Sequence, residues 1–303
     1  MPTAELFGLA GNYRRLIRGN GPMGSAYQVG KAVVAVRLWR PIGSGPFHYL
    51  IDDDIRAGMV DESMPDGYRR RLEFAFGKSL EIVAFDRVES VITPSKRLAD
   101  YYAGKGKRVF RLDPTWDVPE FPDLSHFDSG PLKVGFLGTR SHWADLNLLR
   151  GALEDPRRTW EFHHFLGKRG PDWPVNLSNI VAHAPMPWSS YRSAVKRIRF
   201  HVCVYPMLPT SFNLARSCNK LMEHAMVGAG SLYSSQVPFA DHLVASDAGL
   251  LVADGDWTDT LRELALDRYH CRELALRGHR LGLETSIRAR ASQQELWATL
   301  ARI

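Results

Sequence analysis

Residues 211–240 read SFNLARSCNKLMEHAMVGAGSLYSSQVPFA and give the clearest indication of a fold. Ser217, Lys220 and Glu223 follow one another at three-residue steps, which on a helix places a hydroxyl, an ammonium and a carboxylate along one side. The apolar residues between them supply a buried side, and the GAG segment ends the helix before a short apolar strand. The pattern predicts a helix that presents polar groups to a phosphorylated ligand.

This segment resembles the signature of GT-B-fold glycosyltransferases of the large retaining group that uses nucleotide sugars. In that family a Ser-x-x-Lys-x-x-Glu helix precedes a glycine turn, a strand that ends in serine and a Pro-aromatic pair, here Pro238-Phe239. Residues 91–117, 132–149 and 248–264 are similar to further parts of the family, in the same order. The resemblance implies an α/β protein with two Rossmann-like domains that face a central cleft, the first domain being shortened.

Composition agrees with a folded two-domain protein. The chain has 303 residues, of which 45% are apolar and 24% charged, as is typical of soluble globular proteins. It shows neither a signal segment nor an apolar run long enough to cross a bilayer, so we expect a cytoplasmic protein. Its three cysteines are scattered without metal-ligand spacing and predict reduced thiols.

The formal charge of +6 favours anionic partners. Two basic segments with interspersed apolar residues, 13–18 and 191–200, leave a peripheral contact with the inner face of a membrane open, although a solvated basic face explains each of them as well. No nucleic-acid-binding motif accompanies them, so we expect no nucleic-acid partner. The partners that the resemblance implies are a nucleotide sugar and a glycan or lipid-linked acceptor, with no further cofactor.

Apolar runs alternate with helical patterns on both sides of a proline-containing linker, which predicts two doubly wound units. The linker contains Pro114, Pro119 and Pro122 and continues through the polar residues 123–130. We therefore expect a first domain at 1–128 and a nucleotide-sugar-binding domain at 129–303, whose last helix crosses back toward the first domain. In the first domain we expect strands at 32–38, 49–51, 90–93 and 109–112 and helices at 68–86 and 97–103.

The second domain repeats the alternation. We expect strands at 134–137, 161–166, 180–183, 201–205, 231–234 and 249–252. We expect helices at 144–153, 189–198, 219–227, 259–266 and 271–281, and a separate amphipathic tail helix at 288–303.

A glycine loop follows the strand at 134–137, where ligands of α/β proteins bind. Gly138 permits a close backbone approach, and Arg140 offers its charged fork to a diphosphate unless it pairs with Asp145 instead. The resemblance implies that this loop, including Thr139, faces the donor phosphates or the cleft. His142 is a candidate for contacting the reacting sugar or serving as a base, and a structural role is its alternative.

Lys220 is the strongest candidate for stabilising the leaving diphosphate, whose charge grows as the glycosidic bond breaks. The competing interpretation is an ion pair between Lys220 and Glu223. The resemblance implies that Glu223 accepts hydrogen bonds from the donor ribose. Lys168, at another strand end, is a further candidate for contacting base, ribose or phosphate.

One position departs from the family pattern. Many relatives carry an acidic residue eight positions before the glutamate, and here that position is Ala215. Sugar recognition therefore differs, or activity is lost. Asn213 and Arg216 are candidates for contacting the sugar in its place, and Ser217 and Asn219 complete the expected donor-binding set.

Asp52, Asp53 and Asp54 follow a strand and support a second architecture. In single-domain transferases an Asp-x-Asp unit binds a divalent cation and the donor diphosphate. Similar acidic strand ends also occur in the first domain of the two-domain family, and Lys220 can neutralise phosphate without a metal. We expect these aspartates to line the acceptor side or to be structural, and we expect no metal site.

The function that follows is a retaining, metal-independent glycosyltransferase. Two alternatives stay open. A noncatalytic nucleotide-sugar-binding or glycan-binding protein of the same fold is suggested by Ala215 and the short first domain. A metal-dependent transferase would use Asp52 and Asp54.

Overall fold

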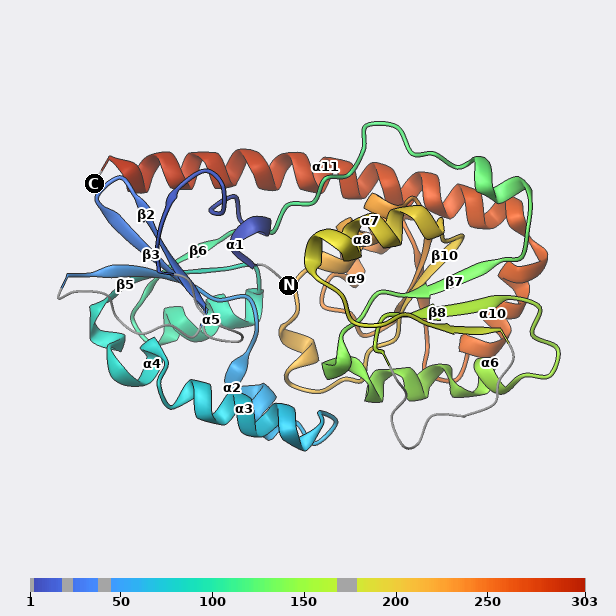
Figure 1. Ribbon diagram of the computed structural model, residues 1–303, viewed down its shortest axis with the longest axis horizontal. Helices are drawn as coiled ribbons and strands as arrows, with labels where there is room; N and C mark the ends of the chain where they lie inside the picture. Colours follow the sequence, from blue (N-terminus) through green and yellow to red (C-terminus); the bar gives the residue numbers. More distant parts are fainter. Residues whose placement is uncertain (1–2, 18–23, 38–44, 168–178, 303) are drawn as a thin grey trace. The chain divides into compact units, whose positions relative to one another are not determined.

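The computed structural model describes residues 3–17, 24–37, 45–167 and 179–302. The chain folds into two compact units, each built on one six-stranded sheet (Figure 1). The first unit combines Met1–Trp116 with Thr210–Asn219 and Ser286–Ile303, and the second combines Asp117–Pro209 with Lys220–Thr285. The first unit therefore includes residues 210–219, which a single division at residue 128 assigns to the second domain.

The sheet of the first unit is mixed, and not wholly parallel as expected from the sequence. Its strands lie in the order β1 (Arg14–Ile17), β2 (Ser25–Val29), β3 (Ala32–Val36), β4 (Phe47–Leu50), β5 (Val88–Thr93) and β6 (Arg108–Arg111). The strands β3 to β6 are parallel, whereas β1 pairs with β2 and β2 with β3 in antiparallel fashion. Gly30 has a φ of +60° in the turn between β2 and β3, a conformation that glycine adopts without strain.

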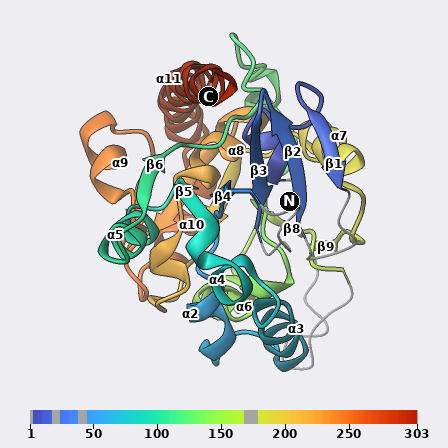
Figure 2. The same cartoon turned by 90° about the vertical axis from the view of Figure 1, so that its left-hand side faces the viewer.

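Helices of the first unit pack against the parallel strands and form a hydrophobic core with them. They are α1 (Thr3–Leu6), α2 (Ile55–Val60), α3 (Asp66–Phe76), α4 (Leu80–Val83) and α5 (Lys96–Gly104), with 3-10 turns η1 (Phe85–Arg87) and η5 (Asn213–Ala215). The helix expected at 68–86 is broken after Gly77, because the chain turns at Ser79 before α4. Helix α5 packs against β5 and β6 (Figure 2), and Phe212 joins the same core.

All six strands expected in the second domain are present, and their sheet is parallel throughout. They are β7 (Lys133–Phe136), β8 (Glu161–His164), β9 (Ile180–Ala182), β10 (Val202–Tyr205), β11 (Gly230–Ser234) and β12 (Leu250–Val252). The spatial order is β12-β11-β10-β7-β8-β9. The chain thus builds outward from β7 to β9, returns to β10 beside β7, and continues outward in the opposite direction.

Helices lie on both faces of this sheet. They are α6 (Arg150–Glu154), α7 (Trp188–Ile198), α8 (Asn219–Val227), α9 (Ala240–Ser246) and α10 (Trp257–Leu266), with 3-10 turns η2 (Ser125–Asp128), η3 (Arg140–His142) and η4 (Ala144–Leu149). Successive strand residues point to opposite faces. Val202 and Val204 join the core formed with α6 and α10. Cys203 points to the other face, where burial and the nearby charge of Glu223 on α8 raise the pKa of its thiol. Helix α8 therefore covers the face opposite α6 and α10 (Figure 1).

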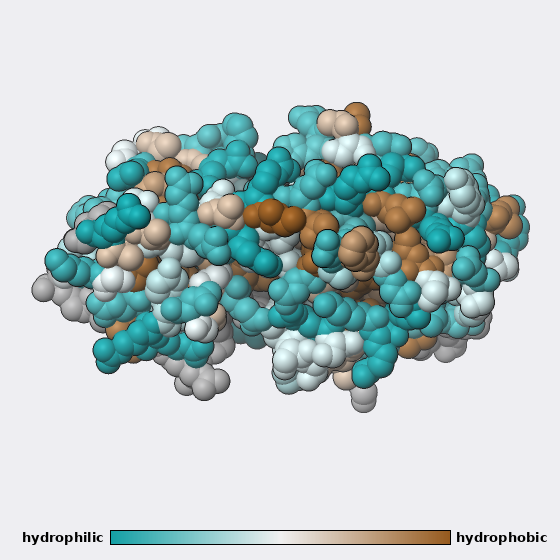
Figure 3. All heavy atoms as spheres, turned by 90° about the horizontal axis from the view of Figure 1, so that it is seen from above, coloured by the Kyte–Doolittle hydropathy of each residue, from teal (hydrophilic) through white to brown (hydrophobic). Residues whose placement is uncertain are grey.

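The last helix, α11 (Arg268–Ala301), is continuous through the region where the sequence predicts two helices. Its first part belongs to the second unit, and residues from Ser286 onward belong to the first. The molecular surface viewed from above, the side on which Figure 1 draws α11, is largely hydrophilic with separate hydrophobic patches (Figure 3). Within the described ranges, no helix combines the length and the apolar content needed to span a bilayer.

Candidate functional site

The second unit has a topological switch point between β7 and β10. These strands are neighbours, yet the chain leaves one toward β8 and the other toward β11. Loops that diverge from adjacent parallel strands leave room between them, and open α/β sheets bind ligands beyond the carboxyl ends of strands at such a point. The candidate site is therefore the set of residues that follow β7 and β10, together with the start of α8.

Lys220, in the first turn of α8, is hydrogen-bonded to the end of β7 at this switch point. Its Nζ donates hydrogen bonds to the backbone oxygen of Leu137, which directly follows β7, and to Oε2 of Glu223. The two side chains of this ion pair are 9% and 1% exposed. The intrahelical ion pair, the competing interpretation from the sequence, is thus present, and it fixes the ammonium at the end of β7.

Tyr191 of α7 completes this buried group. Its hydroxyl donates to Oε1 of Glu223 over 2.7 Å, so both carboxylate oxygens of Glu223 carry a hydrogen bond. Burial, reinforced by the negative charge of Glu223, raises the pKa of Tyr191 well above its usual value. The phenol therefore stays protonated and acts as a donor.

Ser217 does not share a side of α8 with Lys220, so that part of the helix prediction is wrong. Helix α8 begins at Asn219, and Ser217 lies between it and the turn η5. The side chain of Asn219 accepts a hydrogen bond of 2.6 Å from Nε1 of Trp116, within the first unit. Ser217 also belongs to that unit.

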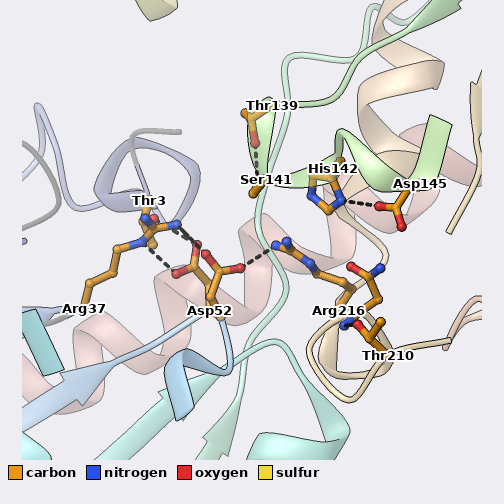
Figure 4. Close-up of polar contacts among 11 residues, drawn as sticks. Thr3, Arg37, Asp52, Thr139, Ser141, His142, Asp145, Thr210 and Arg216 are labelled. Atoms are coloured by element: carbon orange, nitrogen blue, oxygen red, sulfur yellow. Dashed lines mark hydrogen bonds and ion pairs between the residues drawn. The ribbon is translucent and has the colours of Figure 1, made fainter. Parts of the chain in front are cut away.

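His142 and Asp145 form a pair on the segment that follows β7 (Figure 4). His142 Nδ1 lies 2.8 Å from Oδ2 of Asp145, and Oδ1 of Asp145 accepts the backbone N–H of Leu208 over 2.9 Å. His142 and Asp145 are 6% and 2% exposed. The aspartate thus links the segment after β7 to the segment after β10.

Arg140 is exposed at the start of η3 and does not take Asp145 as the partner that the sequence suggested. Its Nε donates to the backbone oxygen of Leu166, beyond β8, over 2.9 Å. Thr139 and Ser141 share a hydroxyl hydrogen bond of 2.8 Å (Figure 4). A Cβ on Gly138 would lie 2.2 Å from the ring of Phe136, so packing alone already requires glycine there.

The acidic residues after β4 form a separate network within the first unit (Figure 4). Asp52 accepts Thr3 Oγ1 and Arg37 Nε, each over 2.9 Å. Asp53 accepts Arg37 Nη2 over 3.1 Å and Arg216 Nη1 over 2.5 Å. Burial lowers the pKa of Arg37, but the charges of the two aspartates more than offset it and raise the pKa overall.

Asp52 and Asp53 are thus paired with side chains of the first unit. Asp54 caps α2 by accepting the backbone N–H of Ala57 over 3.1 Å. Among the described residues, no group of three or more His, Cys, Asp or Glu is arranged to hold a metal ion.

The expected donor residues after η5 also belong to the first unit. Arg216 is held by Asp53, and its guanidinium lies 4.1 Å from the ring centre of Phe212. Asn213 is 3% exposed, and its backbone N–H donates to Thr210 Oγ1 over 3.2 Å.

The structure therefore divides the expected site residues between the two units. The second unit brings together Gly138, Thr139, Arg140, His142, Lys220 and Glu223. The first holds Asp52, Asp53, Asp54, Asn213, Arg216, Ser217 and Asn219. Lys168 lies outside the described residues.

Sequence reasoning missed the role of Tyr191 and the pairing of Asp145 with His142. The segment 191–200 is conspicuous in the sequence for its charge, which gives no indication of a tyrosine partner for Glu223. The three-residue spacing of His142 and Asp145 was the available signal for their contact.

No protein-family model matches the sequence, and no curated protein matches it. Solved structures do resemble the chain: S. aureus TarM, crystallised with α-GlcNAc-glycerol and UDP, has a TM-score of 0.60 at 12% identity over 85% of this chain and 51% of its own. Anabaena HepE, in complex with UDP and glucose, has a TM-score of 0.57 at 11% identity over 85% and 72%. The T4 phage enzyme BGT, with UDP-glucose, has a TM-score of 0.56 at 12% identity over 89% and 82%.

These likenesses establish the fold: two Rossmann-like units in the GT-B arrangement of elements. The chain spans about half the length of TarM.

Proposed function

We propose that this GT-B-fold chain is a glycosyltransferase that moves a sugar from a nucleoside-diphosphate donor to a glycan, lipid-linked or small-molecule acceptor. The observation that carries the proposal is the cationic end of β7, where Lys220 is bonded to Leu137 and Arg140 follows three residues later. The similar structures of TarM, HepE and BGT were each solved with UDP or UDP-glucose, which supports a donor of this class.

The two cations have complementary tasks at this end of the sheet. Lys220 uses two of its three N–H groups on Leu137 and Glu223, and the third is suited to a phosphate oxygen. Arg140 keeps its terminal nitrogens on an exposed turn while Nε is fixed on Leu166. As the bond between sugar and diphosphate breaks, negative charge grows on the diphosphate, and preorganised cations stabilise that charge.

Glu223 acts in this proposal through Lys220. Its carboxylate is 1% exposed and already accepts hydrogen bonds from Lys220 and Tyr191. The ribose contact that the sequence resemblance implies is therefore secondary to holding the ammonium in place.

We also propose retention of configuration and independence from metal, following the resemblance of residues 211–240 to the retaining group. The fold alone does not decide either point. TarM was solved with α-GlcNAc-glycerol, BGT is a β-glucosyltransferase, and BGT was also solved with UDP and Mn²⁺. The anomeric proton coupling in the NMR spectrum of the product tests retention, and transfer in the presence of a chelator tests metal independence.

Calorimetric titration with UDP, UDP-glucose and UDP-N-acetylglucosamine, followed by ADP- and GDP-sugars, is the decisive first experiment. We expect micromolar binding of at least one of them and its slow hydrolysis without an acceptor. Arg140→Ala should weaken binding about tenfold, whereas Arg150→Ala, whose exposed side chain pairs with the exposed Glu154, serves as the matched control. If none of these nucleotides binds at millimolar concentration, the proposal fails.

A noncatalytic nucleotide-sugar-binding protein is the second candidate, favoured by Ala215 at the position where many relatives carry an acid. That function predicts thermal stabilisation by the nucleotide sugar without hydrolysis or transfer. A cytoplasmic location, with or without peripheral binding to the inner face of a membrane, stays a prediction. Co-sedimentation with anionic vesicles tests the membrane binding, which would use the basic helix α7.

A further inference from the structure

A cavity lies at the carboxyl-terminal ends of α7 and α8, two helices that are neighbours in the second unit (Figure 1). Its volume is about 290 Å³, near the lower end of the range for small-molecule sites. Its walls come from residues within 119–126, from the end of α7 and from residues 226–228 at the end of α8, all in the second unit. The cavity is separate from the candidate site, because Lys220 lies in the first turn of α8.

Two contacts hold the segment 119–126 in place as one wall of this cavity. The backbone oxygen of Pro119 accepts a hydrogen bond of 2.7 Å from Nε2 of His279. Nη2 of Arg199 lies 2.6 Å from Oδ1 of Asp123 and donates to Oγ of Ser125 over 2.8 Å. Arg199 has a φ of +60°, a conformation that a residue with a side chain keeps only where its surroundings hold it. The cavity is therefore preformed.

Apolar side chains line the cavity, and one of them is left in solvent. Met226 and Val227 are 3% and 7% exposed, whereas Phe121 is 80% exposed. A single exposed aromatic residue is ordinary on a protein surface, but this one borders a cavity. An apolar ligand in the cavity would cover the Phe121 ring, which is favourable in proportion to the area removed from water.

The charged residues of the cavity leave one cation for a ligand. Asp123 pairs with Arg199, and hydrogen bonds from the backbone and side chain of Ser125 lower the pKa of Asp123, so this carboxylate stays charged. Burial lowers the pKa of His126, whose ring is therefore neutral at pH 7. Lys196 is exposed near the end of α7, and among the described residues no carboxylate pairs with it. The cavity thus carries one net positive charge.

We propose that this cavity is a binding site for a small amphipathic carboxylate, an alkyl or aromatic group that ends in one carboxylate. The apolar part packs between Phe121 and Met226, and the carboxylate pairs with Lys196. A single unpaired cation beside Asp123 disfavours a phosphate dianion, and a neutral ligand leaves Lys196 without a partner. The inference goes beyond the proposed function and does not depend on it.

Calorimetric titration with octanoate and with 1-octanol tests the role of charge, because the two molecules share an alkyl chain. We expect the wild-type protein to bind octanoate with submillimolar affinity and about fivefold more tightly than octanol. Lys196→Gln should remove this difference by weakening octanoate alone. Arg197→Gln is the matched control, since Arg197 is an exposed neighbour that does not line the cavity. Titration with 3-phenylpropanoate extends the comparison to an aromatic carboxylate.

The role of Phe121 is tested with the same two ligands. Phe121→Ser should weaken octanoate and octanol alike, by about tenfold, because both bury the ring. Tyr269→Ser removes an aromatic side chain that is 74% exposed elsewhere in the second unit, and it should leave both affinities unchanged. Both changes are at exposed positions, so the variants should keep the thermal stability of the wild type.

The inference is wrong if neither octanoate nor 3-phenylpropanoate binds at millimolar concentration. An unchanged ratio of octanoate to octanol affinity in Lys196→Gln, or equal losses in Phe121→Ser and Tyr269→Ser, would also overturn it. A wild-type dimer in analytical ultracentrifugation that Phe121→Ser dissociates would show that a second copy covers this surface instead. Octanoate binding by a protein that binds no nucleotide would leave the inference intact and remove only the proposed function.

Discussion

Lys220 and Glu223 show how a single pair of side chains can be both structural and available for function. Burying two charges is costly, and their attraction repays that cost only when further hydrogen bonds complete the group. Here the backbone oxygen of Leu137 and the hydroxyl of Tyr191 supply those bonds. A preformed ammonium at the end of β7 would need no rearrangement to bind the diphosphate of the proposed donor.

Removing one charge of this pair should therefore be far more harmful than removing both. Glu223→Gln leaves the Lys220 ammonium buried without its counter-charge and should lower the free energy of unfolding by about 3 kcal/mol. The double variant Lys220→Met with Glu223→Gln should regain most of that loss. Urea denaturation followed by fluorescence measures both, and equal losses in the single and double variants would contradict the buried ion pair.

His201 is buried as a neutral group. Its Nδ1 accepts the backbone N–H of Lys133 over 3.0 Å, and its Nε2 donates to the backbone oxygen of His126 over 2.9 Å. Burial, with the nearby charge of Arg268 adding to it, lowers the pKa of His201 to about 4. Protonation would cost Nδ1 its role as an acceptor.

Stability should consequently fall as the pH is lowered. Between pH 6.5 and about 4 the unfolded chain binds a proton at His201 that the folded chain excludes, so the free energy of unfolding decreases over this window, on the order of 2 kcal/mol for this group. Denaturation at pH 7 and pH 4.5 should show a smaller loss for His201→Gln than for the wild type. His242→Gln, on the exposed surface, is the control and should keep the wild-type pH dependence.

Candidate site residues could be read from the sequence only where their contacts follow from local spacing. Lys220 and Glu223 are three apart on one helix, and their pairing was foreseen as an alternative. Asp53 and Arg216 are far apart in the sequence, and no local pattern indicates their ion pair. Tyr191 was missed for the same reason, since its contact with Glu223 depends on how α7 and α8 pack.

At the scale of elements, the contact between α8 and α11 depends on a glycine. A Cβ on Gly282 of α11 would lie 2.3 Å from the Cβ of Ala225 on α8, so the two helices approach more closely than side chains would allow. Helix α8 carries Lys220 and Glu223, and this contact therefore also supports the position of the candidate site.

Gly282→Ala should destabilise the second unit by about 1–3 kcal/mol, because overpacking outweighs the better helix propensity of alanine. Gly67→Ala in α3 is the matched control: a Cβ there meets nothing within 4 Å, so the same change should stabilise slightly, by about 0.5 kcal/mol. Thermal unfolding measured by circular dichroism compares them. A stabilised Gly282→Ala protein would disprove the tight approach.

Elements with a clear hydrophobic pattern could be predicted from the sequence. Elements that form only because they pair with a neighbouring strand could not. The six strands of the second unit are short apolar runs that are buried in a parallel sheet, and each was recognised. The strands β1 and β2 are paired at the edge of the first sheet, and RRLI and SAYQV carry little apolar signal. Helices 271–281 and 288–303 proved to be one, because nothing between them terminates α11.

For the whole molecule, the important fact is that each unit is assembled from separate parts of the chain. The end of α11 belongs to the first unit, where Gln293 donates to the backbone oxygens of Leu6 and Asp113, and Trp297 Nε1 donates to that of Phe7 over 2.9 Å. Trp297 is 2% exposed. The sequence indicated an amphipathic tail helix, but which strands and loops it packs against depends on tertiary contacts.

Trp297→Ala should thus weaken the first unit selectively, by about 3–5 kcal/mol. Hydrogen exchange should show faster amide exchange in β2 to β6, while β7 to β12 keep their protection. Ile287→Ala, on the same helix with 58% exposure, should change stability by less than about 0.5 kcal/mol. Uniform loss of protection in both sheets would mean that the two units unfold together.

The division of the first unit among three segments sets an order of events on the ribosome. The second unit draws on nothing later than Thr285, whereas the first combines residues up to Trp116, which are translated before the second unit, with Thr210–Asn219 and Ser286–Ile303. The residues up to Trp116 must therefore wait, with apolar surface uncovered, until residues 286–303 have been synthesised. A premature stop shortly before Ser286 would leave nearly all of the second unit in place but would remove the last segment of the first unit.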